Sequence, residues 1–336
     1  MLKRGVQKLV NVFTHGHCFD GLASAVMFTK LLEHVGDSAG YTFEYHGAGY
    51  GPGENGVLPA RLTGDVTAIL DYRFTASSSL EWYFDHHVSA FVSDDDRLFY
   101  SDRIAEKMSP STRKSRKYFH DGAYTSCTKL IADIAKETFG VDLSSQRELI
   151  QWADIIDSAA FSSAEMAVER KEPVMKLMTV VEHHGDDAFL SAYARRLLVE
   201  PLSEVAASKE IAERYEPIRI VHDRYIEQVK KSSEIVGDCV LVDMSPFDFD
   251  IAPKFVTYAL YPERSYSVVL TRSKKKCKIS IGYNPWSKKA RQHNIASMCE
   301  RYGGGGHPVV GAVSMLATEV DKAKALAKKL AEELSQ

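Results

Sequence analysis

Short apolar runs alternate with segments of helical periodicity through the first third of the chain. Four runs have the composition of buried strands, namely Gln7–Phe13, Tyr41–Tyr45, Val66–Leu70 and Trp82–Phe84. Polar residues follow each of these runs. After the first run, Leu22–Leu32 repeats apolar positions at the spacing of a helix. Short apolar strands separated by helices favour a parallel α/β sheet.

The pattern changes at about residue 200. Residues 123–196 are mostly helical, and Leu202–Ser232 predicts one long polar helix that connects two domains. A strand-rich block follows, with runs at Asp238–Asp243, Tyr266–Thr271 and Cys277–Tyr283, and a final helix at Val320–Leu334. We therefore expect an α/β protein. It has an N-terminal parallel-sheet domain over 1–200, a helical linker over 201–235 and a smaller mixed α/β domain over 236–336.

Composition excludes several classes of protein. The 336 residues are 45% hydrophobic and 26% charged, as in ordinary globular proteins. The net charge is −3, which excludes a generally basic protein that coats nucleic acid. The five cysteines are scattered without C-x-x-C spacing, which argues against a disulfide framework or a cysteine-only zinc site. No apolar run approaches the roughly 18 residues of a membrane helix, and no signal peptide is visible. We predict a cytoplasmic protein without a membrane partner.

Polar side chains gather where the predicted strands end. They are His15, His17 and Asp20 in one loop, Asp71 after the third strand, and Asp85, His86 and His87 after the fourth. Asp154 and Asp157 lie one helical turn apart. Ligands of open α/β sheets bind beyond the carboxyl ends of the strands, so these groups are expected to meet in one crevice. Such nitrogen and oxygen ligands suit Mn²⁺, Fe²⁺ or Zn²⁺, and paired ions catalyse phosphoester hydrolysis.

A second candidate site lies near the C-terminus. Four consecutive glycines, Gly303–Gly306, leave backbone N–H groups open to an anion. His307 can donate to a phosphate, and Arg301 stands beside the loop. A predicted helix at Ile295–Tyr302 and an apolar run at Val309–Met315 frame the glycines, which favours ligand contact over a flexible linker.

These motifs resemble those of the DHH phosphoesterases. Asp85-His86-His87, with His15, Asp20 and Asp71 before it, resembles the N-terminal motifs, and Asp157 with Phe161 resembles the fourth. Gly303–Ala312 resembles the glycine-rich motif of the DHHA1 domain. The ordered set spans residues 14–315. The chain length is similar to that of stand-alone nano-RNase/pAp phosphatases rather than of the larger RecJ exonucleases.

The resemblance implies an active site in a cleft between two domains. Asp71 would bridge two Mn²⁺ ions, with Asp20, His86 and Asp157 on one ion and His15 on the other. His87 would contact the scissile phosphate, and Asp85 would orient the two histidines. The nucleotide would contact Gly304, Gly305, Gly306, His307, Arg301 and Ser280. Water activated by the metals would be the nucleophile.

The chain departs from the family pattern at two places. Cys18 stands where the first motif usually has an aspartate, so Cys18 or His17 would supply that ligand and favour Zn²⁺ or Fe²⁺. Alternatively, only the ion at Asp20 is bound. Before the glycine motif, Ser280 is present, but Gly282 stands where the resemblance leads us to expect an arginine.

The sequence therefore predicts a metal-dependent hydrolase, a phosphodiesterase or phosphatase with nuclease activity on short oligonucleotides or nucleotides such as pAp. Two alternatives stay open: a cyclic-dinucleotide phosphodiesterase, and a non-catalytic nucleotide-binding protein with a degenerate first motif. The basic runs Ser109–Lys117 and Lys274–Lys278 lack interleaved aromatics, so stable binding of long nucleic acid is not expected. A homodimer is also left open.

Overall fold

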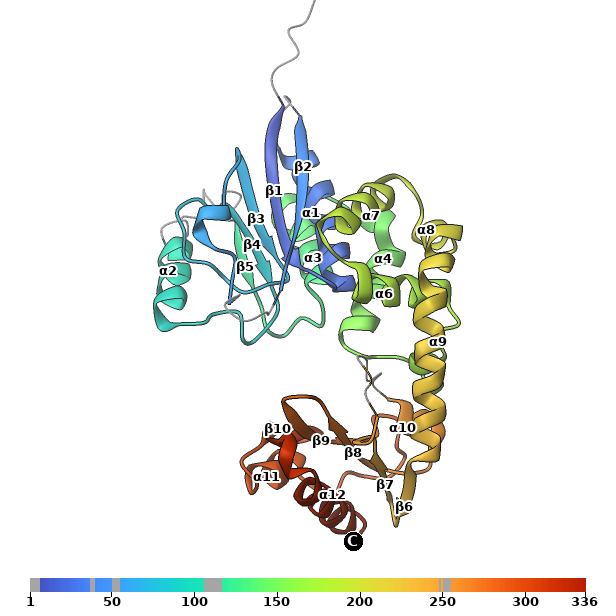
Figure 1. Ribbon diagram of the computed structural model, residues 1–336. Coiled ribbons are helices and arrows are strands. Elements are labelled where there is room, and N and C mark those ends of the chain that lie inside the picture. The colour runs from blue at the N-terminus through green and yellow to red at the C-terminus, as the bar shows by residue number, and fades with distance from the viewer. Residues whose placement is uncertain (1–6, 37–39, 50–54, 106–116, 248, 250–254) are drawn as a thin grey trace, which may run out of the picture. The chain divides into compact units, whose positions relative to one another are not determined.

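The structure is a computed structural model that describes residues 7–36, 40–49, 55–105, 117–247, 249 and 255–336 (Figure 1). Most of the basic run Ser109–Lys117 lies outside these residues. Contacts divide the chain into two compact units. Unit 1 comprises Met1–Ala160 and Glu172–Tyr215, and unit 2 comprises Phe161–Lys171 and Glu216–Gln336.

Unit 1 is built on a five-stranded parallel sheet with the order β2-β1-β3-β4-β5. The strands are β1 (Lys8–His15), β2 (Tyr41–Ala48), β3 (Val66–Leu70), β4 (Trp82–Asp85) and β5 (Tyr118–His120). Every residue of β3 and β4 is buried, as central strands of a parallel sheet require. The strand order reverses between β1 and β3, which is where sheets of this type bind ligands.

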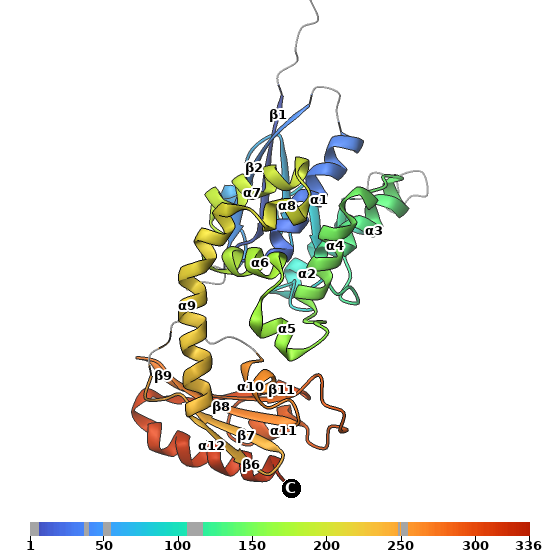
Figure 2. The same cartoon turned by 90° about the vertical axis from the view of Figure 1, so that its right-hand side faces the viewer.

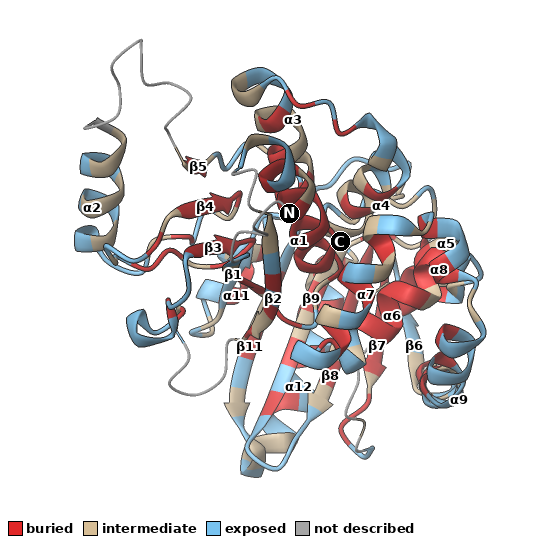
Figure 3. Cartoon of the chain, turned by 90° about the horizontal axis from the view of Figure 1, so that it is seen from above, coloured by how far each residue is buried: buried red, intermediate tan, exposed pale blue. Residues whose placement is uncertain are grey.

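Both faces of this sheet are covered (Figures 1 and 2). The helices are α1 (Phe19–Val35), α2 (Asp94–Ala105), α3 (Cys127–Phe139), α4 (Arg147–Asp157), α6 (Pro173–His184), α7 (Asp187–Val199) and α8 (Leu202–Ala206). Helix α1 packs against α3, α4 and α7, and Figure 3 shows that it is buried along most of its length. On the other face, Phe74 and Tyr83 pack against Phe99 and Tyr100 of α2. The parallel α/β prediction for the N-terminal half is confirmed.

The prediction of one helix over Leu202–Ser232 is wrong. The structure has two helices there, α8 and α9 (Lys209–Lys231). The hydroxyl of Ser208 donates to the Val205 carbonyl oxygen at 2.7 Å, and this hydrogen bond closes α8 before α9 begins. The division between units 1 and 2 falls inside α9, after Tyr215.

Unit 2 has a six-stranded mixed sheet with the order β10-β11-β9-β8-β7-β6. Its strands are β6 (Ser233–Val236), β7 (Cys239–Asp243), β8 (Tyr266–Arg272), β9 (Lys276–Tyr283), β10 (Gly305–His307) and β11 (Val310–Leu316). Its helices, besides the second part of α9, are α5 (Ala164–Glu169), α10 (Val256–Leu260), α11 (Ile295–Glu300) and α12 (Val320–Leu334). Helices α11 and α12 contribute to an apolar core with Val268, Ile279 and Ile281. The predicted mixed α/β character of the C-terminal half is confirmed.

None of the helices in the described residues is a candidate for a membrane span. Over the described parts of the chain, no helix is both long and apolar enough to cross a bilayer, in agreement with the sequence. All five cysteines are described and are free thiols, and four of them are buried.

Gly282 in β9 has a structural cause. The Tyr258 hydroxyl, from α10, accepts a hydrogen bond from the Ser267 hydroxyl of β8 at 2.9 Å, and Ser267 is the register partner of Gly282. A Cβ atom at residue 282 would overlap with the Tyr258 hydroxyl oxygen. The tyrosine therefore occupies the space that the expected arginine would need.

Gly282→Ala is expected to destabilise unit 2 by about 1–3 kcal/mol, because the added methyl group overlaps with Tyr258. Tyr258→Phe alone removes one hydrogen bond, worth about 1 kcal/mol. The double variant should lose less stability than the sum of the single variants, because phenylalanine leaves room for the methyl group. Urea unfolding of the four proteins measures this coupling. Strict additivity would show that the overlap is not the cause.

Candidate metal centre and glycine loop

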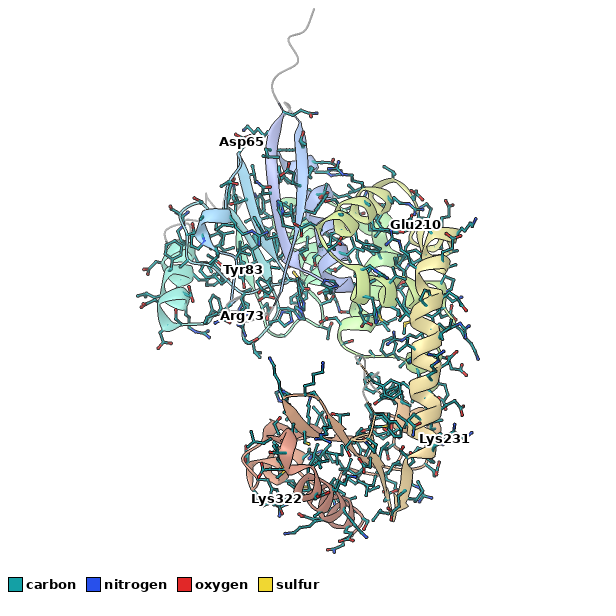
Figure 4. All side chains as sticks on the ribbon, viewed as in Figure 1. Asp65, Arg73, Tyr83, Glu210, Lys231 and Lys322 are labelled. Carbon is teal, nitrogen blue, oxygen red and sulfur yellow. The ribbon has the colours of Figure 1, made fainter. Side chains whose placement is uncertain are left out.

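The predicted ligands in unit 1 gather at the edge of the sheet where the strands end. They are His15 at the end of β1, Asp71 after β3, and Asp85, His86 and His87 at and beyond the end of β4. Figure 4 shows the direction of β3: Asp65 precedes the strand at one end of the sheet, and Arg73 follows it at the other. The ligand edge is therefore the carboxyl edge.

Three groups of side chains in the described residues have ligand atoms that lie within 4.8 Å of one another. The groups are His15, Cys18 and Asp71; Asp71, His86 and His87; and Asp20, His86 and Asp157. Asp71 is common to the first two groups and His86 to the last two, so the groups form one continuous cluster. His17 is exposed and belongs to none of the three. Of the two replacements considered for the missing aspartate, it is Cys18 that lies beside His15 and Asp71.

Asp71 and His86 have buried polar atoms without a hydrogen-bond partner. Asp71 is 0% exposed, and neither of its carboxylate oxygens has a donor. His86 Nδ1 lies 3.1 Å from the Tyr124 carbonyl oxygen and donates to it, which leaves a lone pair on Nε2. That buried Nε2 lies 3.2 Å from Asp157 Oδ2, 3.5 Å from Asp71 Oδ1 and 3.8 Å from Asp20 Oδ2. Metal-binding histidines typically have this arrangement: one ring nitrogen donates a hydrogen bond that fixes the ring, and the other directs its lone pair towards the ion.

The electrostatics of the cluster also fit a divalent cation. Burial raises the pKa of Asp71 well above its ordinary value, and the charges of Asp20 and Asp157 raise it further. Burial, with a smaller effect of His87, lowers the pKa of His15 to about 4, so His15 is neutral at pH 7. A bound divalent cation favours ionised carboxylates and neutral imidazoles. The residues present therefore fit a divalent metal.

Asp20 is held by the N-terminus of α3. Its Oδ2 accepts from the Cys127 backbone N–H at 2.7 Å, and its Oδ1 accepts from the Thr128 N–H at 3.0 Å. Burial raises the pKa of Asp20, whereas the hydrogen bonds from Thr128 act in the opposite direction. Sequence reasoning missed both donors, because they are backbone groups more than 100 residues away. The available signal was Ser126, which caps α3.

Asp154 organises the neighbouring loop. Its carboxylate accepts hydrogen bonds from the hydroxyl groups of Thr125 and Ser126. These bonds join α4, which carries Asp157 one turn later, to the loop whose Tyr124 carbonyl orients His86. Asp154 is therefore placed to position ligands and belongs to none of the three groups described above.

Asp85 orients the histidine pair. Its Oδ1 accepts from His87 Nδ1 at 2.8 Å and from the His86 backbone N–H at 2.9 Å, and its Oδ2 accepts from the Tyr83 hydroxyl at 3.0 Å. The hydrogen bond from His87 to Asp85 raises the pKa of His87, against the opposing effect of burial. The His87 side chain is 34% exposed. The His87 ring can therefore reach a ligand while Asp85 holds its orientation.

The four glycines of unit 2 have different structural causes. A Cβ at Gly304 or Gly306 would overlap with a carbonyl oxygen of β11, and Gly303 has a positive φ of 70°. Gly305 differs, because a Cβ built there meets no atom within 4 Å. Backbone geometry thus explains three of the glycines. Gly305 is exposed, and neither packing nor a positive φ explains a glycine there.

The other predicted nucleotide contacts also lie in unit 2. Ser280 is half-buried on β9 and alternates with the core residues Ile279 and Ile281, so its side chain lies on the opposite face of the sheet. His307 ends β10 and is exposed. Arg301 pairs with Glu333 of α12 at 2.5 Å, and this ion pair raises the pKa of Arg301. Its guanidinium therefore already has a partner within unit 2.

Comparison with solved structures finds proteins of the same fold. The pGpG-specific phosphodiesterase PggH from Vibrio cholerae matches with a TM-score of 0.65 and 17% identity, over 96% of this chain and 98% of that chain. The DHH domain of a member of the s1p family of ribosomal proteins matches with a TM-score of 0.53 and 12% identity, over 98% and 88%. RecJ from Thermus thermophilus, in complex with Mn²⁺, matches with a TM-score of 0.51 and 12% identity, over 97% of this chain and 52% of RecJ.

No protein-family model and no curated protein matches the chain. The structural matches show that the chain has the fold of DHH-domain proteins, and they extend over nearly its whole length. The fold that the motif resemblance implied is therefore confirmed.

Asp85→Asn is expected to lower the pKa of His87, because the hydrogen bond to the carboxylate stabilises the imidazolium. Because the pKa of His87 is higher in the folded than in the unfolded protein, protonation of His87 adds to the free energy of unfolding. This contribution is fully present below about pH 6.5 and is lost as the pH rises through the pKa of His87 in the folded protein. NMR titration of labelled histidines in the metal-free protein measures the shift. Asp142→Asn, an exposed aspartate, is the matched control. An unchanged His87 titration in Asp85→Asn would rule out this role.

Proposed function

We propose that the chain is a metal-dependent phosphoesterase that hydrolyses short oligonucleotides or small nucleotides such as pAp. The observation that carries the proposal is that the buried oxygens of Asp71 and the buried Nε2 of His86, at the centre of the cluster, lack hydrogen-bond partners. Divalent ions bound there would activate water as the nucleophile and offset the charge of the phosphoryl oxygens. The likeness in fold to PggH and to RecJ with Mn²⁺ supports this class of reaction.

The proposed ion positions correspond to two of the three groups of ligand atoms, and His87 of the remaining group is assigned to the substrate. Asp71 contributes to two ion positions. Asp20, His86 and Asp157 complete one position, and His15 with Cys18 completes the other. Mn²⁺ suits the first of these, whereas the thiol of Cys18 favours Zn²⁺ or Fe²⁺ in the second.

His87 is proposed to bind the scissile phosphate. Its Nδ1 donates to Asp85, and this hydrogen bond raises the pKa of His87, which favours the protonated imidazole that can donate to an anion. Unit 2 is proposed to hold the rest of the nucleotide through Gly304, Gly305, Gly306, His307 and Ser280. Arg301 is the least available of the proposed contacts, because Glu333 already pairs with it.

A linear substrate is preferred to a cyclic one. PggH, which has the same fold, is described as specific for pGpG, a linear dinucleotide. The two alternatives that the test must distinguish from this preference are hydrolysis of a cyclic dinucleotide and nucleotide binding without turnover. The cytoplasmic location and the homodimer stay predictions from the sequence.

Asp71→Asn is expected to lower turnover with Mn²⁺ by more than about 100-fold. The substitution removes a charge shared by two ion positions, whereas loss of an outer hydrogen-bond partner typically costs about 10–100-fold. The measurement is hydrolysis of pGpG, pApA, pAp and cyclic di-AMP, with Asp142→Asn as the matched control. Tight nucleotide binding without turnover at Mn²⁺, Zn²⁺ and Fe²⁺ would support a binding protein and contradict the proposal.

Gly305→Ala is expected to raise the KM for the preferred nucleotide by about tenfold or more, because the methyl group would keep a phosphate away from the backbone N–H, and a lost charge-assisted hydrogen bond is worth about 1.5–3 kcal/mol. Its melting temperature should not change, because the added methyl group meets open space. Gly304→Ala is the contrasting variant and should lower the melting temperature through overlap with β11. An unchanged KM in Gly305→Ala would remove this residue from the binding loop.

A further inference from the structure

The two ends of the metal-binding cluster differ in ligand chemistry. At one end, Asp20, His86 and Asp157 offer two carboxylates and an imidazole. At the other end, His15, Cys18 and Asp71 offer an imidazole, a thiol and a carboxylate. Thiolate ligands select softer ions such as Zn²⁺ and Fe²⁺, and carboxylates suit Mn²⁺ and Mg²⁺. Two positions with different donors can therefore select two different metals.

The fold holds Cys18 at the second position. Cys18 is the N-cap residue of α1, yet its side chain makes no capping hydrogen bond. The preceding loop is fixed by a hydrogen bond from the Gly16 N–H to the Ala48 carbonyl oxygen at 2.7 Å and by one from the His17 N–H to Gly185 at 3.2 Å. Gly185 is required there, because a Cβ on it would lie 2.8 Å from the His17 backbone. These constraints fix the loop that brings Cys18 close to His15 and Asp71.

A second observation shows that this position is built for a ligand. Asp71 is fully buried, and both of its oxygens lack a donor, so one of its oxygens lies within 4.8 Å of the Cys18 sulfur without a hydrogen-bond partner. Cys127, the other thiol near the cluster, behaves differently. Its Sγ donates to the Phe84 carbonyl oxygen at 3.3 Å, and it belongs to none of the three groups. Cys127 is therefore a packing thiol, whereas Cys18 lies among candidate ligands.

We propose that the chain holds a mixed-metal centre, with Zn²⁺ or Fe²⁺ at His15–Cys18–Asp71 and Mn²⁺ at Asp20–His86–Asp157. This inference rests on the metal centre of the proposed function and assigns different ions to its two positions. On binding, the thiol of Cys18 loses its proton to solvent, and a sulfur–metal bond forms as the ion loses a water molecule. A carboxylate at residue 18 would make both positions suit Mn²⁺.

The test uses the metal-free full chain and two metals as probes, without substrate. With Co²⁺, a thiolate-to-cobalt charge-transfer band in the near ultraviolet should rise and saturate at one equivalent. Cys18→Ser and Cys18→Asp should lose the band while still binding Co²⁺, and Cys127→Ser should keep it. With Mn²⁺ alone, followed by electron paramagnetic resonance of the free ion, the wild type should bind one Mn²⁺ tightly and Cys18→Asp should bind two.

The possible outcomes separate this inference from the proposed function. Binding of Co²⁺ without the band, or tight binding of two Mn²⁺ by the wild type, would overturn the mixed-metal assignment and leave a metal centre in place. Failure of the wild type to bind either ion would overturn the proposed function itself. Circular dichroism checks that each variant folds. If both Cys18 variants misfold, the charge-transfer band and the Mn²⁺ stoichiometry of the wild type still show whether the two positions take different metals.

Discussion

The group of carboxylates around His86, with Asp20 and Asp71 fully buried, is the constraint on which the rest of unit 1 depends. Two unit charges about 4 Å apart repel by about 4 kcal/mol at the effective dielectric constant of sites near a protein surface. Asp20, Asp71 and Asp157 all approach the same imidazole nitrogen, and Asp71 has no hydrogen-bond donor at all. Such a set is stable when it takes up protons or a cation. Divalent ions satisfy the orphaned oxygens and the imidazole lone pair together.

The surrounding fold orients these ligands before any ion binds. Helix α3 directs two backbone N–H groups at Asp20, and the loop before it directs the Tyr124 carbonyl at His86. Asp154 fastens that loop to α4, so the two structures that position His86 and Asp157 are joined. Outer contacts of this kind fix the tautomer and orientation of ligands and are a large part of metal affinity.

The sequence predicted the strands and the polar residues that follow them, because both signals are local. Apolar runs identify β1, β3 and β4, and the ends of parallel strands converge on one edge. Contacts between distant segments were not predictable in this way. The choice of Cys18 over His17 depends on how the loop after β1 is held against Ala48 and Gly185. Likewise, the glycine at position 282 is explained only by Tyr258 of α10, whose hydroxyl group occupies the space beside it. The role of Arg301 as an ion-pair partner depends on Glu333, which α12 places next to it.

Anomalous diffraction from a crystal of the wild-type chain grown with Mn²⁺ and recorded at the manganese absorption edge tests the central claim most directly. We predict an anomalous peak enclosed by Asp71, Asp20, His86 and Asp157. If Mn²⁺ is present in excess and no peak lies beside Asp71, the cluster is not a metal centre. Protonated carboxylates hydrogen-bonded to one another at that position would then explain the burial of Asp71 and would contradict a metal-dependent phosphoesterase.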